Sequence, residues 1–365
     1  MDWENEIKTS IRTPNDLSEH IAMSADEQSL MAEILEKYPL SVTPYYLSLI
    51  DFSDPNDPIR KMAIPSLAET DLSGSLDTSG EAGNTVMAGL QHKYKETALM
   101  LSTGQCAMYC RHCFRKRLVG LPEEEVARQF AAIRGYIQAH QEISNVLISG
   151  GDALMNSNER IDSILSMLND ISHLDVIRIC TRMPVVLPAR IIEDSELQTL
   201  MERHNRIKQI FMVTQFNHPR EVTEKAVSAV KCVLQLGIPV LNQTVLLRGV
   251  NDDPNIMGAL LKGMTRIGVK PYYVFQCRPV TGVSKQFQVP LIEGYKIVKQ
   301  ARAMQNGLGK AFCYCMSTVA GKMEIIGELR PGEMLFRYHE AADESRLGSF
   351  IVRQIEKNQT WLDMK

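Results

Sequence analysis

The segment CAMYCRHC, residues 106–113, places Cys106, Cys110 and Cys113 within eight residues of one another. Thiolates are preferred ligands of zinc and of iron–sulfur clusters. A structural zinc ion takes four protein ligands, and here the fourth could only be His112, which would have to fold back onto the same metal. A [4Fe-4S] cluster held by three cysteines fits the spacing better, because it leaves one iron open for another molecule. A zinc site or separate free thiols are the alternatives.

Basic residues follow the first two cysteines and continue beyond the third. They would offset the negative charge of the thiolates and of an anionic substrate. These residues are Arg111, Arg115, Lys116 and Arg117.

Outward from this segment, short β-rich runs alternate with stretches that carry apolar residues at helical spacing. Such alternation predicts right-handed crossovers and a parallel sheet. Six units favour a partial (β/α)6 barrel, an α/β fold, over a doubly wound sheet. The six runs are ALMLST (98–103), NVLISG (145–150), VIRICTR (176–182), QIFMVTQF (209–216), PVLNQTVLL (239–247) and KPYYVFQC (270–277).

We expect three parts along the chain. Residues 1–92 are predicted to be a helical and loop extension, with Ser24 as the N-cap of a helix, and residues 93–290 the barrel core. Residues 291–365 form a C-terminal segment, in which YCMSTVAGKMEIIG is predicted to be a hairpin. The last thirty residues are predicted to form a helix that packs on the body or on a neighbouring subunit.

Polar residues stand at the end of each β-rich run. In barrels of this type the chemistry lies at the carboxyl ends of the strands, so these residues predict one shared site. The alternative is that polar residues simply follow strands into loops. The groups are Ser149-Gly150-Gly151-Asp152, Thr181-Arg182, Gln215 with Asn217 and His218, Asn242-Gln243-Thr244, and Gln276-Cys277-Arg278.

Composition excludes several classes of function. The 365 residues are 44% hydrophobic and 23% charged with a net charge of −3, which argues against nucleic-acid binding. No apolar run approaches the roughly 20 residues needed to cross a bilayer. The opening MDWENEIKTS lacks the apolar stretch of a secretory signal, so we expect a cytoplasmic protein with free thiols or metal-bound cysteines.

Longer motifs carry a resemblance to a known family. Cys-x3-Cys-x2-Cys on the first βα loop is the signature of the radical S-adenosylmethionine (SAM) superfamily, and SGGD resembles its site for the methionine amino group. Over residues 40–330 the chain resembles the lysine 2,3-aminomutase family. The matching stretches are MYCRHCFRKR, LISGGDALM, TRMPVVLPARI, FNHPREVTEKA, GIPVLNQTVLLRGVND and KPYYVFQC.

The resemblance implies a reaction and its cofactors. A [4Fe-4S] cluster on Cys106, Cys110 and Cys113 would cleave SAM to a radical, and pyridoxal 5′-phosphate (PLP) would carry an amino group between the α- and β-carbons of an amino acid. An external reductant of the flavodoxin or ferredoxin type would supply electrons. We further expect a homo-oligomer, with no nucleic acid and no membrane among its partners.

The resemblance also implies roles for single residues. Lys322, in STVAGKMEI, would bind PLP covalently, Lys93 its phosphate and His112 its ring, although Lys322 could instead be a surface hairpin residue. Arg115 matches the arginine that holds the substrate carboxylate. SAM would be bound by residues that follow the strands, the last four of which could equally serve the core: Ser149, Gly150, Gly151, Asp152, Arg182, Gln215, His218 and Gln243.

Several positions depart from the family pattern. Arg278 stands where the lysine enzyme has an aspartate for the substrate ammonium, and the run MSTVAGK lacks the second aspartate. A cationic side chain facing Arg278 would be repelled, so we expect an acidic or neutral substrate such as glutamate, unless Arg278 turns away. Thr97 replaces an arginine of the phosphate site, for which Lys95 could compensate.

The family's subunit-bridging zinc site has no counterpart in these motifs. Asp253 stands at its first cysteine, no Cys-rich tail follows, and we expect no structural zinc. Cys313 and Cys315 are left as core or loop thiols.

Four hypotheses follow from these patterns. The leading one is a 2,3-aminomutase with a substrate other than lysine. A PLP-independent radical SAM enzyme, such as an epimerase or dehydrogenase, and an aminomutase acting on a protein lysine are alternatives. The fourth is an iron–sulfur sensor or a zinc-stabilised binding module without catalytic activity.

Overall fold

One twelve-stranded sheet forms the centre of the molecule, for which a computed structural model describes residues 3–121 and 125–362. Its strands follow in sequence order, and each pairs in parallel with the next from β3 to β9. The parallel strands are β3 (Thr97–Thr103), β4 (Asn145–Gly150), β5 (Val176–Cys180), β6 (Gln209–Thr214), β7 (Val240–Leu246), β8 (Val269–Gln276) and β9 (Cys313–Ser317).

The six predicted strands are therefore confirmed as β3 to β8, with ends shifted by no more than two residues. The sheet does not close, since β3 and β8 lie apart in the strand order. The partial (β/α)6 architecture is thus correct, with antiparallel strands added at both edges.

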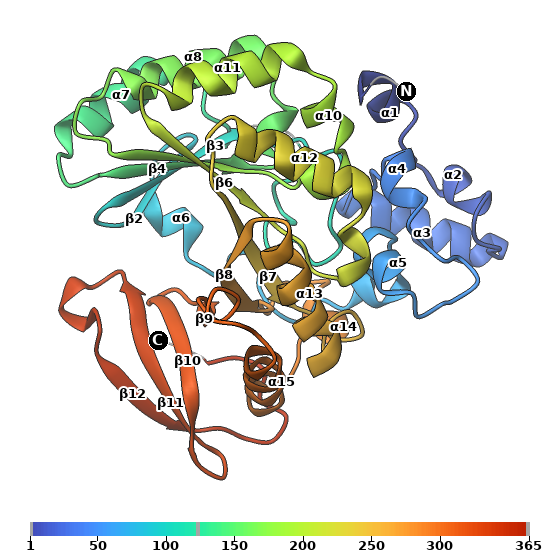
Figure 1. The fold of residues 1–365 in the computed structure, drawn as a ribbon. Coiled ribbons are helices and arrows are strands. Elements are labelled where there is room, and N and C mark those ends of the chain that lie inside the picture. Colours follow the sequence, from blue (N-terminus) through green and yellow to red (C-terminus); the bar gives the residue numbers. More distant parts are fainter. Residues whose placement is uncertain (1–2, 122–124, 363–365) are drawn as a thin grey trace.

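Helices cover the outer face of the parallel strands, while the N-terminal helices gather on another side of the molecule (Figure 1). The covering helices are α7 (Phe130–Ala139), α8 (Asn158–Asn169), α9 (Met183–Val186), α10 (Ala189–Ile192), α11 (Ser195–Asn205), α12 (Glu224–Gln235) and α13 (Pro254–Arg266). Further helices are α1 (Trp3–Lys8), α2 (Pro14–Ser18), α3 (Ala25–Lys37), α4 (Pro44–Leu47), α5 (Pro58–Ala63), α6 (Glu81–Asn84), α14 (Ser284–Phe287) and α15 (Leu291–Ala303), with short 3₁₀ turns at η1 (Leu67–Thr70), η2 (Ala153–Met155), η3 (Pro219–Glu221) and η4 (Glu344–Arg346).

Local sequence explains several helix starts. Ser24 caps α3 as predicted, because its side chain accepts from the Glu27 backbone while Glu27 bonds back to Ser24. Asp253 caps α13 by accepting from the backbone N–H groups of Asn255 and Ile256. Asp253 stands where the family has a zinc-binding cysteine, and in this chain its carboxylate caps a helix.

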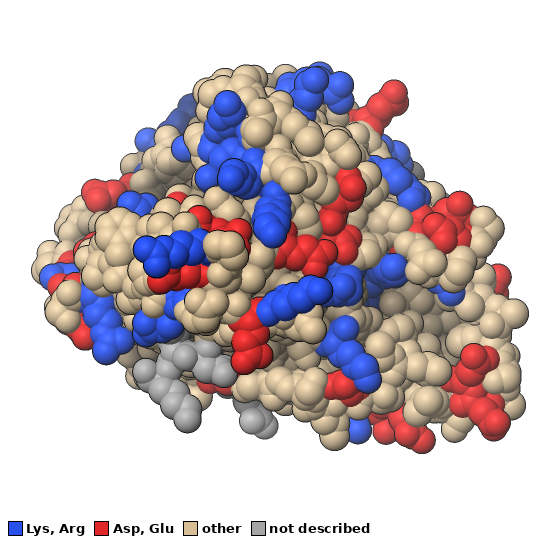
Figure 2. Space-filling model, turned by 90° about the horizontal axis from the view of Figure 1, so that it is seen from below, with Lys and Arg blue, Asp and Glu red and all other residues tan. Residues whose placement is uncertain are grey.

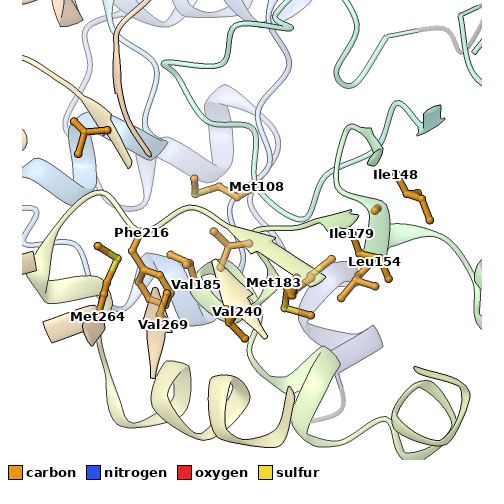
Figure 3. Close-up of a cluster of buried hydrophobic side chains, with 14 of the residues drawn as sticks. Met108, Ile148, Leu154, Ile179, Met183, Val185, Phe216, Val240, Met264 and Val269 are labelled. Atoms are coloured by element: carbon orange, nitrogen blue, oxygen red, sulfur yellow. The ribbon is translucent and has the colours of Figure 1, made fainter. Parts of the chain in front are cut away.

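The hydrophobic core lies between the strands and the covering helices. Ile148, Ile179 and Val240 lie on this side of β4, β5 and β7, and Leu154 and Met183 reach it from the segments that follow β4 and β5 (Figure 3). All five side chains are buried, which is the burial that an alternating strand pattern produces.

Two regions differ from the sequence-based prediction. The N-terminal extension ends in strands β1 (Thr85–Met87) and β2 (Leu90–Tyr94), and β2 pairs with β3. The expected hairpin after β9 is confirmed as β9 with β10 (Gly321–Arg330). The C-terminal helix is wrong, because β11 (Glu333–Ala341) and β12 (Phe350–Gln354) extend the sheet instead.

The period of the C-terminal pattern explains this correction. Met334, Phe336 and Tyr338 are buried on alternate positions of β11, a period of two that indicates a strand. The same sheet continues across the predicted boundaries near residues 92 and 290. The division of the chain into three parts remains a prediction, and the three parts share one sheet.

On the face shown in Figure 2, lysine and arginine side chains lie among aspartates and glutamates. Within the described ranges, no helix is both long and apolar enough to span a membrane.

Candidate active site

A cavity of about 380 Å³ opens at the carboxyl ends of the parallel strands. Its walls come from the cysteine loop, from the ends of β4 to β8 and from Lys322 on β10. The residues to which the sequence assigned a cofactor or substrate role line this cavity except His218, and of the other strand-end residues Asn217, Asn242 and Thr244 lie outside the lining. The polar strand ends therefore converge on one site, as a barrel requires.

The three cysteines follow β3 and face the cavity. Cys110 Sγ accepts a hydrogen bond from Arg182 Nη1 at 2.9 Å, and Cys113 Sγ accepts from the Arg115 backbone at 3.3 Å. Burial raises the pKa of Cys106 and raises that of Cys113 to about 11. Since metal binding deprotonates thiols, a bound cluster would offset this cost.

The spacing of the sulfur atoms favours a cluster over one zinc ion. Among the described residues, only Cys313, Glu324 and His339 bring ligand atoms within 4.8 Å of one another as a group of three or more. The three sulfur atoms of the loop do not all lie within that distance of one another, as expected when each thiolate binds a different iron.

The basic residues of the loop have different tasks. Arg111 and Lys116 are buried and pair with Glu69, with 2.5 Å from Arg111 Nη2 to Glu69 Oε2. Arg117 lies outside the cavity lining and pairs with Glu81, which belongs to the lining, and with Glu125. Only Arg115 among the four lines the cavity, so the others position the loop rather than a substrate.

Two glycines bring β4 against the cysteine loop. A Cβ at Gly150 would stand 2.3 Å from the Thr103 carbonyl oxygen, and one at Gly151 would stand 2.2 Å from the Gln105 carbonyl oxygen. Gly150 also has φ near +114°. Only glycine permits this approach, which leaves room for a small polar ligand beside Cys106.

Asp152 joins the ends of two strands. Its carboxylate accepts from Thr181 Oγ1 and from the Arg182 backbone, both at 2.6 Å. Burial raises the pKa of this carboxyl. Both oxygens are thus engaged within the protein, which makes Asp152 a positioning residue for the SGGD segment.

The other predicted SAM contacts differ in their surroundings. Arg182 is buried between Cys110 and Glu221, 2.5 Å from Glu221 Oε1. Gln215 and Gln243 line the cavity with half-buried side chains. His218 lies outside the lining, where its Nδ1 accepts from the Arg220 backbone at 3.2 Å and caps η3.

His112 is buried beside the cluster cysteines and lines the cavity. Its Nε2 lies 3.2 Å from Asn217 Nδ2, and its Nδ1 has no hydrogen-bond partner among the described residues. Burial, with the nearby Arg182 charge, lowers the pKa of His112 to about 3, so the ring is neutral.

Arg115 and Arg278 form a cationic pair in the cavity. The Arg115 side chain donates to Glu81 at 2.9 Å and to Ser149 Oγ at 3.1 Å. Both guanidinium groups lie over the ring of Phe114, at 4.5 Å for Arg115 and 4.1 Å for Arg278. Arg278 Nη1 is buried without a hydrogen-bond partner among the described residues. Burial is the main cause that lowers the pKa of Arg278 to about 10. The nearby Glu81 charge opposes this shift, and the Arg115 charge adds to it.

Lys322 enters the same cavity from β10. Its Nζ lies 4.4 Å from the ring centre of Tyr273 and 5.9 Å from that of Tyr94. Burial is the main cause of its lowered pKa, opposed by Glu340 on the neighbouring strand. A desolvated amine of this kind is a better nucleophile than an exposed lysine.

Lys93, on β2, also lines the cavity. Its Nζ donates to the backbone carbonyls of Ser79 at 2.9 Å and Thr318 at 2.6 Å. Burial, then the Arg278 charge, lower the pKa of Lys93 to about 8. Lys95 does not compensate for Thr97, because it is 48% exposed and pairs with Glu344.

Sequence reasoning missed Arg178, which also lines the cavity. It lies on β5, on the same face of the strand as Cys180, which also lines the cavity. Its Nε has no hydrogen-bond partner among the described residues. The signal was present in VIRICTR, since Arg178, Cys180 and Arg182 stand at every second position of this β-rich run, a polar pattern that points to an interior site.

Comparison with known proteins now bears on these residues. A model of the Radical SAM superfamily matches residues 100–257. The chain is 37% identical over 320 residues to the L-lysine 2,3-aminomutase of Acetoanaerobium sticklandii, covering 87% of this chain and 74% of that protein. The enzyme of the same name from Clostridium subterminale is 36% identical over 324 residues, with the same coverage. The glutamate 2,3-aminomutase of Clostridioides difficile is 34% identical over 314 residues, covering 84% and 72%.

The chain belongs to the lysine 2,3-aminomutase family of radical SAM enzymes. It is therefore an isomerase. Members of this superfamily use a [4Fe-4S] cluster and SAM and need a reductant, and the lysine 2,3-aminomutases use PLP.

The site of this aminomutase fits those groups on its own chemistry. Three thiols face the cavity, as the cluster requires. Gly150 and Gly151 at the end of β4 have no side chains, which leaves the space that the methionine part of SAM requires. The cavity lining carries six basic residues and three acidic ones. The excess of positive charge suits carboxylates and a phosphate. The basic residues are Lys93, Arg115, Arg178, Arg182, Arg278 and Lys322, and the acidic ones are Glu81, Asp152 and Glu340.

Proposed function

We propose that this chain is a PLP-dependent 2,3-aminomutase whose substrate is an amino acid other than lysine, with an acidic amino acid such as glutamate favoured. The observation that carries the proposal is Arg278, which lines the cavity beside Arg115 with Nη1 unpaired among the described residues. A buried donor of this kind gains free energy when a carboxylate reaches it.

The two arginines suit the two ends of a dicarboxylic amino acid. We assign the α-carboxylate to Arg115 and the side-chain carboxylate to Arg278. Glu81 already satisfies Arg115 Nε and part of the local charge, and it leaves Arg278 for the substrate. A lysine ammonium in this place would meet two guanidinium groups, so electrostatic repulsion disfavours lysine.

Lys322 is our candidate for the covalent PLP lysine. It is the lysine of the Gly-Lys pair in β10, and it faces the cavity between the rings of Tyr94 and Tyr273. Lys93 and Arg178 are our candidates for the phosphate, because both are cationic and line the same cavity. A neutral amine and nearby cations are what a phosphorylated aldehyde requires.

The residues of the chain divide the work around these groups. When bound, the reduced cluster with SAM supplies a carbon-centred radical, and PLP carries the migrating nitrogen. Arg115 and Arg278 orient the substrate, and Phe114 holds both guanidinium planes in place. Arg182 and Asp152 keep the cysteine loop and the SGGD segment together.

We also propose a cytoplasmic enzyme and a homo-oligomer. All eight cysteines are free thiols, which suits a reducing compartment. Size-exclusion chromatography with light scattering tests the oligomer.

The experiment is an oxygen-free screen of free amino acids with the reconstituted enzyme, a reductant and SAM. The readouts are 5′-deoxyadenosine and the β-amino acid formed, both by mass spectrometry. We expect glutamate to give both products and lysine to give neither above background. Turnover of lysine with no turnover of acidic or neutral amino acids would overturn the substrate assignment.

The variant Arg278→Asp sharpens the screen. It restores a carboxylate at this position, so we expect glutamate turnover to fall by about 100-fold, corresponding to roughly 3 kcal/mol, and lysine turnover to rise. The matched control is Arg266→Asp on the exposed surface of α13, which should leave both activities unchanged. A glutamate rate unaffected by Arg278→Asp would show that Arg278 does not hold the substrate.

The same screen separates the other hypotheses. A PLP-independent radical enzyme would form 5′-deoxyadenosine with no lysine-bound PLP absorbance. An enzyme for protein lysines would show no β-isomer of any free amino acid.

A further inference from the structure

We propose that Cys313, Glu324 and His339 form a binding site for one divalent cation of the zinc class, separate from the cluster loop, which fixes the strand that carries Lys322. The proposal concerns the C-terminal sheet and does not depend on which amino acid the enzyme uses.

Three neighbouring strands supply the three side chains. Cys313 lies on β9, Glu324 on β10 and His339 on β11, and β10 pairs with both of the others. Their ligand atoms lie within 4.8 Å of one another, and all three residues are half-buried. Tetrahedral zinc needs ligand atoms roughly 3.3–3.8 Å apart, so small side-chain rotations would complete the site.

The donor set selects the metal. One thiol, one imidazole and one carboxylate form a mixed N, S and O set, which suits zinc and is unlike the oxygen-only sites of magnesium or calcium. A thiolate and a carboxylate together balance the charge of a divalent cation. Cys315 adds a further sulfur two residues along β9, where it is fully buried and interacts with Cys313.

Neighbouring residues already hold two of the ligands in place. Tyr273 OH lies 2.7 Å from His339 Nε2, which leaves Nδ1 for a cation. Glu324 Oε2 accepts from Arg337 Nη2 at 2.5 Å, which leaves Oε1. Hydrogen bonds that orient a metal-binding histidine and carboxylate through their second atoms are the usual support of metal sites.

The site is connected to the active cavity through β10 and Tyr273. Glu324 follows Lys322 by two residues, so both side chains leave the same face of the strand. Tyr273 touches both parts, because its hydroxyl meets His339 and its ring lies beside Lys322 Nζ. A cation here would join β9, β10 and β11 and hold Lys322 at its place in the cavity.

The test begins with a full chain in which the cluster cannot form. In the variant Cys106→Ala/Cys110→Ala/Cys113→Ala, purified without oxygen and treated with chelator, Co²⁺ is added and absorbance is recorded. We expect one equivalent of Co²⁺ with a thiolate charge-transfer band and tetrahedral d–d bands, displaced by Zn²⁺. Further substitution by Cys313→Ser or His339→Asn should weaken binding by at least about tenfold, while Cys232→Ser should not.

A second measurement uses the reconstituted holoenzyme. We expect one zinc per chain in addition to cluster iron, lost in Glu324→Gln, which keeps the shape of the side chain. Absence of tetrahedral cobalt spectra in the cluster-free chain, or unchanged metal content in Glu324→Gln, would overturn the site. Neither measurement uses an amino-acid substrate. A negative result would therefore overturn the cation site and leave the proposed function untouched, and the reverse also holds.

Discussion

The parallel strands β3 to β8 and the strands β9 to β12, which pair antiparallel with one another, contribute to the same cavity in different ways. In the parallel part, most of the predicted site residues stand near the end of a strand or in the turn after it, so strand and functional residue are neighbours in sequence. In the antiparallel part, Lys322 reaches the cavity through the pairing of β10 with β9 and β11. The part of the cavity around the three cysteines, the cluster end, is thus determined by local sequence. The part around Lys322, the lysine end, depends on strand register.

Register matters because the side-chain period of a strand is two. A shift of one residue between β9 and β10 would turn Lys322 away from the cavity and bring Met323 toward it. The pairing of Lys322 with Ser317 and with Glu340 therefore decides the chemistry at this end. The following predictions test the difference between the two ends.

The largest effect is expected for Cys113→Ala at the cluster end. Loss of one thiolate ligand should prevent cluster assembly, and formation of 5′-deoxyadenosine should fall more than about 1,000-fold. Iron content and electron paramagnetic resonance of the reduced protein check the result. Cys232→Ser, on the outer helix α12, is the control and should keep full cluster content.

Lys322→Ala should affect the other end alone. We expect the cluster to assemble and some SAM to be cleaved, while β-amino acid formation falls at least about 100-fold because the covalent anchor is gone. The ratio of the two products and the absorbance of lysine-bound PLP are the measurements. Lys270→Ala, exposed on β8, should change neither, and a Lys322→Ala enzyme with normal isomer yield would contradict the assignment.

Gly151→Ala tests the close approach of β4 to the cysteine loop. The new Cβ would meet the Gln105 carbonyl oxygen at 2.2 Å, so we expect a loss of about 1–3 kcal/mol in the free energy of unfolding and weaker SAM binding. Gly135→Ala in α7 is a matched control, since nothing lies within 4 Å of its Cβ. It should stabilise the protein by up to about 1 kcal/mol, as measured by thermal unfolding.

The smallest effect is expected for the pH dependence of stability through Lys93. Its pKa falls from the usual 10.5 to about 8 on folding, so the folded protein loses this proton at lower pH than the unfolded chain does. Stability should therefore rise with pH between about 8 and 10.5, by less than about 1.4 kcal/mol per pH unit. Lys93→Met should make that rise smaller, while buried lysines such as Lys116, whose pKa is also lowered to about 8, keep the remainder.

The control for this prediction lies two residues away. Lys95 is exposed, and Lys95→Met should leave the slope of stability against pH unchanged over the same range. Urea unfolding of the protein without cofactors at several pH values gives the slope. A slope equal in Lys93→Met and the parent chain would show that Lys93 keeps its proton in the folded state.

Particular elements show how far prediction from sequence reached. The strands before SGGD and Thr181-Arg182 were placed because buried parallel strands are short, apolar and bounded by turns. A helix was predicted for the last thirty residues, although most of Glu333–Ala341 falls among them and its alternation of buried and half-buried residues has the period of a strand. The stretch EEEVARQFAAIRGYIQAHQ, residues 123–141, has the apolar spacing of a helix, of which the structure forms α7, and its residues 123 and 124 lie outside the described ranges.

The candidate site divides in the same manner. The motif predicted Cys106, Cys110 and Cys113, and most of the polar residues predicted at the strand ends line the cavity. His218 was assigned to the cavity because it follows β6, but the chain turns there and uses its ring as a helix cap. Arg178 was missed because it lies within a strand rather than after one.

The sequence by itself determined the cysteine loop, the order of strands and helices, and the glycines that no other residue can replace, because each depends on neighbours along the chain. Only the tertiary structure decided that Arg278 Nη1 has no hydrogen-bond partner among the described residues, that Lys95 points to solvent, and that Cys313, Glu324 and His339 meet across three strands. These features depend on burial and strand register, which bring together residues that are distant in the sequence and that no local pattern relates.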